Sequence, residues 1–195
     1  MNLFRTLGVA SLVCLTGAGL NGCINAPDYD STPEIEFKSL DKVYVPRSGG
    51  LLARDTLRFA LDFKDGEGDL GLSDNDIRVA PYNSTTGGPN NRGNGVNFII
   101  QPFIQRKVAG GNGNFEKYVI AAQGEYDGRF LRLDDVDGAE SKPAPLRGTL
   151  RYKLPLELDG ISFKPGDVFR FDIYIVDRAL HRSNTITTTP ITLGP

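Results

Sequence analysis

The chain has few of the residues on which catalysis and disulfide bonding usually depend. Its 195 residues include 2 Cys, 1 His and 0 Trp, and no Gly-x-Ser-x-Gly motif that would indicate the nucleophile of a hydrolase. The single histidine, His181, lies in a polar segment, where a histidine is usually solvated. Without tryptophan, no aromatic surface on which a sugar ring could stack is evident. Glycosidases use a pair of carboxylates, however, and such pairs are present, so a glycosidase remains an alternative. We therefore expect a protein that is not an enzyme, with a carboxylate-based hydrolase as the alternative.

The chain also lacks a cluster of basic residues. It has 22 Lys and Arg against 24 Asp and Glu, a formal charge of −2, and no basic run. Proteins that bind nucleic acid usually carry a basic patch or stripe. We therefore expect no nucleic acid among its partners.

Residues 1–22 have the features of a secretory signal peptide. One positive charge, Arg5, precedes the uncharged and mainly apolar segment Thr6–Leu20. That segment has about 15 residues, fewer than the roughly 20 that a helix needs to span a membrane. A charged start, a short apolar segment and small residues are typical of a cleaved signal. A buried N-terminal helix is the alternative, but the glycines at the end of the segment would weaken it.

Cys23 follows this segment directly. The sequence Leu20-Asn21-Gly22-Cys23 resembles the lipobox of bacterial lipoproteins. The resemblance implies that the thiol of Cys23 receives a diacylglycerol and that the chain is cut after Gly22. Acyl chains anchor a protein through about 0.8 kcal/mol for each buried CH₂. We therefore expect Cys23 to be a lipid attachment site that holds the protein on a membrane.

The residues around the cleavage point also predict a location. Cys14 lies in the segment expected to be removed, so we expect a mature protein outside the cytoplasm without a disulfide. Residues 23–33 are polar and contain two prolines, which is typical of a flexible, lipid-anchored linker. Ile24 stands where Asp would retain an enterobacterial lipoprotein in the inner membrane. This favours the outer membrane, facing either the periplasm or the cell surface.

The apolar residues beyond residue 33 recur with a period of two, which predicts strands rather than helices. Apolar and polar residues alternate most clearly in 55–64, 150–158 and 168–176, and shorter strands are expected at 35–45, 77–80, 96–105, 115–122, 129–133 and 185–193. Pro155 cannot donate to a ladder, so its strand is expected at a sheet edge or to break there. Loops rich in Gly, Asn and Pro separate the strands. Residues 34–195 are therefore predicted to form a single all-β domain, an antiparallel β-sandwich with long loops.

Two further motifs carry a resemblance. The stretch DFKDGEGDLGL (62–72) resembles an F-x-DGxGDLGL loop of uncharacterised Bacteroidota-type lipoproteins. The stretch DRALHRSN (177–184) resembles their late D-R-A-G-x-x-S-N turn, with Leu180 in the place of glycine. The resemblance implies an immunoglobulin-like sandwich and no established activity.

The loop motif places carboxylates at alternate positions. Asp65, Glu67 and Asp69 are separated by glycines, so that several oxygens can face one point. Calcium takes six to eight oxygen ligands in flexible geometry. In an immunoglobulin-like sandwich the late turn would lie at the same end and bring Asp177 to this loop. We therefore predict a structural calcium site at Asp65, Glu67, Asp69 and Asp177, with Asp74 or Asp76 as further ligands. A solvated acidic turn beside Arg178 is the alternative.

Three classes of function remain for a protein of this kind. The first is a cell-envelope lipoprotein that binds a protein or glycan partner through its loops without catalysis. The second is a structural or assembly component of an envelope complex. The third is the carboxylate-based hydrolase. We expect the first, with the membrane contacted through the lipid anchor.

Overall fold

A computed structural model describes residues 27–83, 95–108, 111–119, 126–134 and 144–195. The expected signal peptide at residues 1–22 and the lipidation site Cys23 lie outside these ranges. Within the described residues, no helix has both the length and the apolar character needed to cross a membrane.

Long alternating segments of the sequence form one antiparallel sheet of three strands. Its order is β1 (Glu34–Val45), β2 (Ala53–Asp65) and β5 (Leu146–Leu158), with β2 in the centre. β5 carries Pro155 and lies at the sheet edge, as its missing N–H requires.

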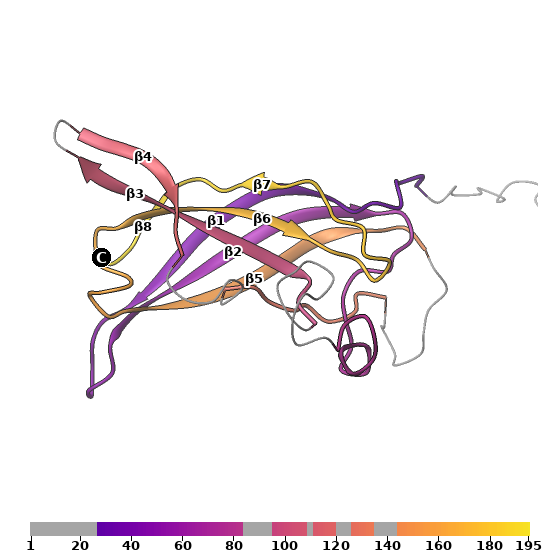
Figure 1. Cartoon of the computed structure of the whole chain (residues 1–195), viewed down its shortest axis with the longest axis horizontal. Coiled ribbons are helices and arrows are strands. Elements are labelled where there is room, and N and C mark those ends of the chain that lie inside the picture. The colour runs from indigo at the N-terminus through magenta and orange to yellow at the C-terminus, as the bar shows by residue number, and fades with distance from the viewer. Residues whose placement is uncertain (1–26, 84–94, 109–110, 120–125, 135–143) are drawn as a thin grey trace, which may run out of the picture.

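A second antiparallel sheet packs on the first (Figure 1). Its order is β4 (Gly111–Lys117), β3 (Phe98–Val108), β6 (Val168–Ile175) and β7 (Ile186–Thr187), while the short β8 (Ile191–Thr192) also pairs with β6. The expected all-β fold with two packed antiparallel sheets is therefore confirmed. Its immunoglobulin-like character stays a prediction.

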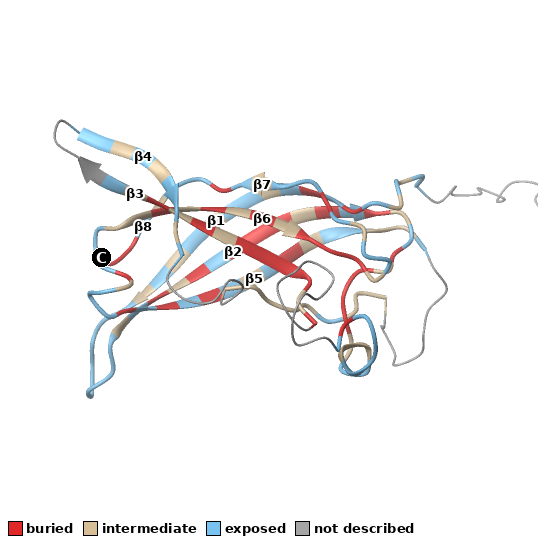
Figure 2. Cartoon of the chain, in the orientation of Figure 1, coloured by how far each residue is buried: buried red, intermediate tan, exposed pale blue. Residues whose placement is uncertain are grey.

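The core lies between the two sheets and is made by every second residue of the long strands. Along β6, buried side chains alternate with half-buried ones, and the same banding is visible on β2 (Figure 2). The rings of Phe59 and Phe171 meet edge to face across the sandwich, with centroids 5.2 Å apart. Such aromatic pairs add about 0.5–1.5 kcal/mol beyond their buried area. The period-two pattern is thus what drives the sheets together.

Two of the shorter expected strands do not form. Residues 77–80 were expected to be extended, but the chain forms a 3-10 turn, η1 (Asp76–Arg78). The cause is local, because the N–H of Ser73 donates to Asp76 Oδ2 at 2.7 Å and the N–H of Asp76 donates to Ser73 Oγ at 3.2 Å. This reciprocal capping favours a helical turn over a strand. Residues 129–133 are also irregular, and Phe130 joins the rest of the fold through backbone and Asn97 contacts.

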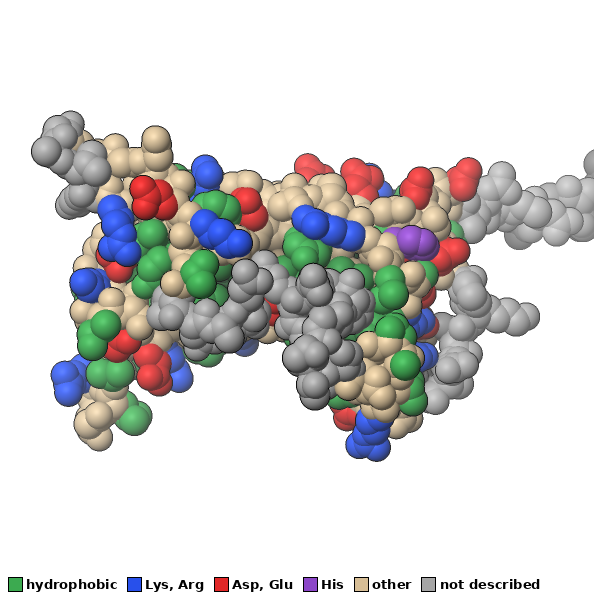
Figure 3. Space-filling model, viewed as in Figure 1, with side chains coloured by type: hydrophobic (Ala, Val, Ile, Leu, Met, Phe, Trp, Pro, Cys, Tyr) green, Lys and Arg blue, Asp and Glu red, His purple; other side chains and the backbone are tan. Residues whose placement is uncertain are grey.

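Charged side chains of both signs are interspersed over the visible face of the molecule (Figure 3).

The loop that follows β2 and the turn that follows β6 lie at the same end of the sandwich (Figure 1). They are joined directly, because the N–H of Arg178 donates to the backbone oxygen of Asp69 at 3.2 Å. This end of the sandwich holds the candidate site.

Candidate metal centre

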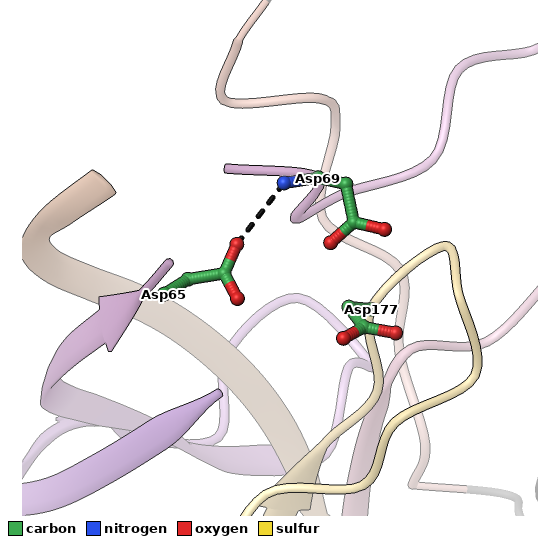
Figure 4. Close-up of side chains that lie close together, drawn as sticks. All are labelled: Asp65, Asp69 and Asp177. Atoms are coloured by element: carbon green, nitrogen blue, oxygen red, sulfur yellow. Dashed lines mark hydrogen bonds between the residues drawn. The ribbon is translucent and has the colours of Figure 1, made fainter. Parts of the chain in front are cut away.

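Three aspartates from distant parts of the sequence meet at the end of the sandwich (Figure 4). Asp65 is the last residue of β2, Asp69 lies in the loop that follows, and Asp177 comes just after β6. Each offers a carboxylate oxygen, and these oxygens lie within 4.8 Å of one another. This arrangement brings together three of the four residues predicted from the sequence.

Asp65 is fully buried at the end of β2. Its side chain has 0% exposure, and its Oδ2 accepts the N–H of Asp69 at 3.0 Å. Its Oδ1 is buried and finds no hydrogen-bond donor among the described residues. Burial, followed by the negative charges of Asp69 and Asp177, raises the pKa of Asp65 to about 6. A buried carboxylate oxygen without a donor is costly, so Oδ1 is placed to accept a proton or a cation.

Asp69 links the loop to the late turn. Its Oδ2 accepts the N–H of Ala179 at 3.0 Å, while its Oδ1 is buried without a hydrogen-bond donor among the described residues. Burial raises the pKa of this carboxyl above its ordinary value. Asp69 therefore presents a second free oxygen beside that of Asp65.

Asp177 is held in place by His181. The N–H of His181 donates to Asp177 Oδ1 at 2.7 Å, and the imidazole Nδ1 lies 3.0 Å from Oδ2. Burial raises the pKa of Asp177, and the charge of Asp177 raises the pKa of His181. The imidazole thus orients a carboxylate in the manner of the groups that support metal ligands.

The neighbouring Arg178 does not neutralise the three carboxylates by direct ion pairing. Its guanidinium makes a two-pronged contact with Asp134 at 2.6 and 3.1 Å. It also donates to the backbone oxygens of Leu70 and Gly71. Asp65 and Asp177 are thus buried, Asp69 is half-buried, and the guanidinium of Arg178 is paired with Asp134 rather than with these carboxylates.

The remaining acidic residues of the loop lie apart from this group. Glu67 is exposed and is not one of the three clustered carboxylates. Asp74 forms an ion pair with Arg129 at 2.7 Å. Asp76 binds Arg132 through two hydrogen bonds of 2.9 and 2.7 Å, and this contact holds the pKa of Asp76 well below its usual range. Asp74 and Asp76, named as further ligands, are thus occupied by arginines.

The glycines of the loop are required by close backbone contacts. A Cβ on Gly66 would lie 2.3 Å from the backbone oxygen of Tyr29, and one on Gly68 would lie 2.0 Å from that of Ala144. Gly68 also has a φ of +69°, which favours glycine. Their spacing between carboxylates therefore serves packing as well as curvature.

The sequence did not single out the role of His181 in orienting Asp177. The spacing of four residues between them was the available signal, because a short turn brings such residues together. The arrangement as a whole supplies hard oxygen ligands, which suit Ca²⁺, Mg²⁺ or Mn²⁺.

No protein-family model and no curated protein matches the chain. Among solved structures, the chain is similar to one described as the X-ray structure of Northeast Structural Genomics Consortium target SoR45. The two are 10% identical, the match covers 85% of this chain and 89% of that chain, and the TM-score is 0.28. A likeness of this size carries no conclusion about function.

Proposed function

We propose that this protein is a lipid-anchored component of the cell envelope, a non-enzymatic module whose loops bind a protein or glycan partner. We propose further that Asp65, Asp69 and Asp177 hold a calcium ion that stiffens these loops. The observation that carries the ion site is the buried Oδ1 of Asp65, which lacks a donor and lies beside two further carboxylates.

The electrostatics of the site favour a divalent cation. Desolvation and the charges of Asp69 and Asp177 both raise the pKa of Asp65. A bound cation offsets both effects at neutral pH, since it supplies positive charge where the carboxylates repel one another.

The donor set favours calcium among the divalent cations. Each of the three carboxylates offers one oxygen to a common point, and calcium takes six to eight oxygens at about 2.3–2.6 Å with tolerant geometry. Exposed Glu67 and water can complete the shell. Zinc prefers nitrogen and sulfur, but the Nδ1 of His181 is already engaged by Asp177.

An ion at this position would join two loops of different origin. Asp65 and Asp69 belong to the end of β2 and its loop, whereas Asp177 belongs to the turn after β6. Crosslinking these segments lowers the entropy that a loop loses when it meets a partner. This is how a structural ion serves a binding module.

The test is thermal unfolding of residues 27–195 in 1 mM calcium and in chelator. With a dissociation constant near 10 µM, calcium should add about 2.7 kcal/mol to the free energy of unfolding. The double variant Asp65→Asn, Asp69→Asn should lose this difference, whereas the control Asp74→Asn, from the same loop, should keep it. Equal melting of the parent protein in calcium and chelator, with no calcium retained after dialysis, would reject the ion site.

A further inference from the structure

The outward face of the β1–β2–β5 sheet contains an open hollow of about 500 Å³. Four of the nine residues that line it are basic, Lys38, Arg58, Arg151 and Lys153, and one, Asp41, is acidic. Ala60 belongs to its floor, and this small residue leaves room between the longer side chains. The hollow is therefore a recessed surface framed by cations.

The strand register places like charges opposite each other in this hollow. Arg58 of β2 is the direct partner of Lys153 of β5, and Ala60 is the partner of Arg151. Arg58 and Arg151 are then diagonal neighbours on one face of the sheet, with Cα atoms about 7–8 Å apart. Like charges directly opposite destabilise a sheet. Asp41 lies opposite Arg58 on the β1 side, so one negative charge offsets this repulsion in part and the hollow keeps an excess of positive charge.

The carboxylates of this face do not form ion pairs with these three cations. Asp62 is bound to Lys38 at 2.8 Å and to the hydroxyl of Thr149. Asp41 is the β1 partner of Arg58 in the register. Within the described part of the chain, however, Arg58, Arg151 and Lys153 make no salt bridge. The hydrogen bond from Lys38, with a smaller contribution from the charge of Arg151, lowers the pKa of Asp62. The hydrogen-bond donors of Arg58, Arg151 and Lys153 nevertheless remain available to a ligand.

We infer that this hollow binds an acidic polysaccharide, whose carboxylates contact Arg58, Arg151 and Lys153. Guanidinium groups bind carboxylates through two parallel hydrogen bonds, and a polysaccharide carries its carboxylates in a regular row. The ligand would lie across the middle of the sheet, from β5 toward β1. The inference names a ligand class for the proposed binding function and rests on that function.

A glycan fits this surface better than an acidic protein or a membrane. Protein interfaces depend on a large apolar or aromatic anchor. The two aromatic residues that line the hollow, Phe59 and Tyr152, have their rings in the core, where Phe59 packs on Phe171 and Tyr152 on Phe98. A flat lipid surface cannot enter a recess, whereas a single polysaccharide chain can.

The hollow is separate from the candidate metal centre. Ala60 precedes Asp65 by five residues on β2, which is about 17 Å at 3.4 Å per residue. The two sites can therefore be tested independently with different variants.

The experiment is a binding titration of residues 27–195 with polygalacturonate, in chelator so that calcium does not crosslink the polymer. Neutral dextran of similar length is the control ligand. Binding should be seen with polygalacturonate alone and should weaken at least tenfold between 50 and 200 mM salt. The variant Arg58→Gln, Arg151→Gln should bind at least tenfold more weakly than the parent protein.

The matched control is Arg54→Gln, Lys64→Gln, which removes the same charge from the same outward face of β2 outside the hollow. It should retain affinity within about twofold. Equal loss in the two double variants would reject the hollow as the site, because only net charge would then matter. Failure to bind polygalacturonate, or tighter binding to phosphatidylglycerol vesicles, would also overturn the inference.

A pull-down from the native envelope separates this inference from the proposed function. If the parent protein and Arg58→Gln, Arg151→Gln capture the same partner equally, the binding function stands and the hollow is rejected. If neither captures a partner and polygalacturonate does not bind, both are rejected.

Discussion

Asp177 and His181 close the turn after β6 with two contacts between the same residues. The amide N–H of His181 lies 2.7 Å from Asp177 Oδ1, and Nδ1 lies 3.0 Å from Oδ2. The side chain of His181 is 42% exposed, while that of Asp177 has 0% exposure. The histidine thus connects the buried carboxylates to solvent and can report on their charge.

Calcium should lower the pKa of His181. The negative charge of Asp177 raises this pKa above its ordinary value in the ion-free protein, and a bound cation would offset that charge. The chain has 1 His, so its imidazole signal in an NMR titration needs no assignment by mutation. Asp65→Asn with Asp69→Asn is the control, for which calcium should have no effect. An identical His181 titration with and without calcium in the parent protein would contradict the site.

Replacing Asp65 by asparagine should stabilise the protein in chelator at neutral pH. Burial raises the pKa of Asp65 from 3.8 to about 6, so between these values the unfolded chain loses a proton that the folded chain keeps. The free energy of unfolding therefore falls as the pH rises through this window. Asp65→Asn removes this pH dependence. The free energy of unfolding of the variant, relative to that of the parent, should therefore be roughly 1–3 kcal/mol higher at pH 7 than at pH 4.

Urea unfolding at both pH values measures this difference, with Asp74→Asn as the control outside the carboxylate group. In calcium the sign should reverse, because asparagine removes an ion ligand. If the free energies of unfolding of Asp65→Asn and the parent differ by the same amount at pH 4 and pH 7 in chelator, Asp65 does not carry this proton.

Leu180→Gly should make the protein more stable. Leu180 has a φ of 71°, the one positive value for a residue other than glycine among the described residues. This conformation costs an ordinary residue roughly 1–2 kcal/mol, and Leu180 is 41% exposed, so little packing is lost. After the added entropy of glycine in the unfolded chain, we expect a gain of about 0.5–1 kcal/mol. Leu180→Ala keeps the Cβ and should show no such gain in thermal unfolding.

Cys23→Ala should release the protein from membranes. The acylation expected at Cys23 anchors through its buried CH₂ groups, and alanine offers no thiol for it. The full-length variant should move from the membrane to the soluble fraction of the cell envelope. Ser11→Ala is the control within the signal segment and should fractionate like the parent. Retention of Cys23→Ala on membranes would show that another contact holds the protein there.

The sequence by itself determined the strands with strong alternation. Residues 55–64 and 168–176 carry apolar side chains at every second position, and both regions form long strands. The pattern can be read from the sequence because successive side chains of a strand point to opposite faces, so a half-buried strand alternates apolar and polar residues along its whole length. The order of an acidic loop after β2 and an Asp-Arg turn after β6 was also readable, and it located the candidate site.

Only the tertiary structure decided which carboxylates meet. Asp74 and Asp76 resemble Asp65 and Asp69 in sequence, but distant arginines pair with them, and no local pattern marks Arg129 or Arg132 as those partners. The opposition of Arg58 and Lys153 likewise depends on the register of two strands almost 100 residues apart. Composition and periodicity act over a few residues. Burial and ion pairing depend on contacts between distant segments. Which charged side chains end without an ion-pair partner is therefore decided only when the sheets have packed.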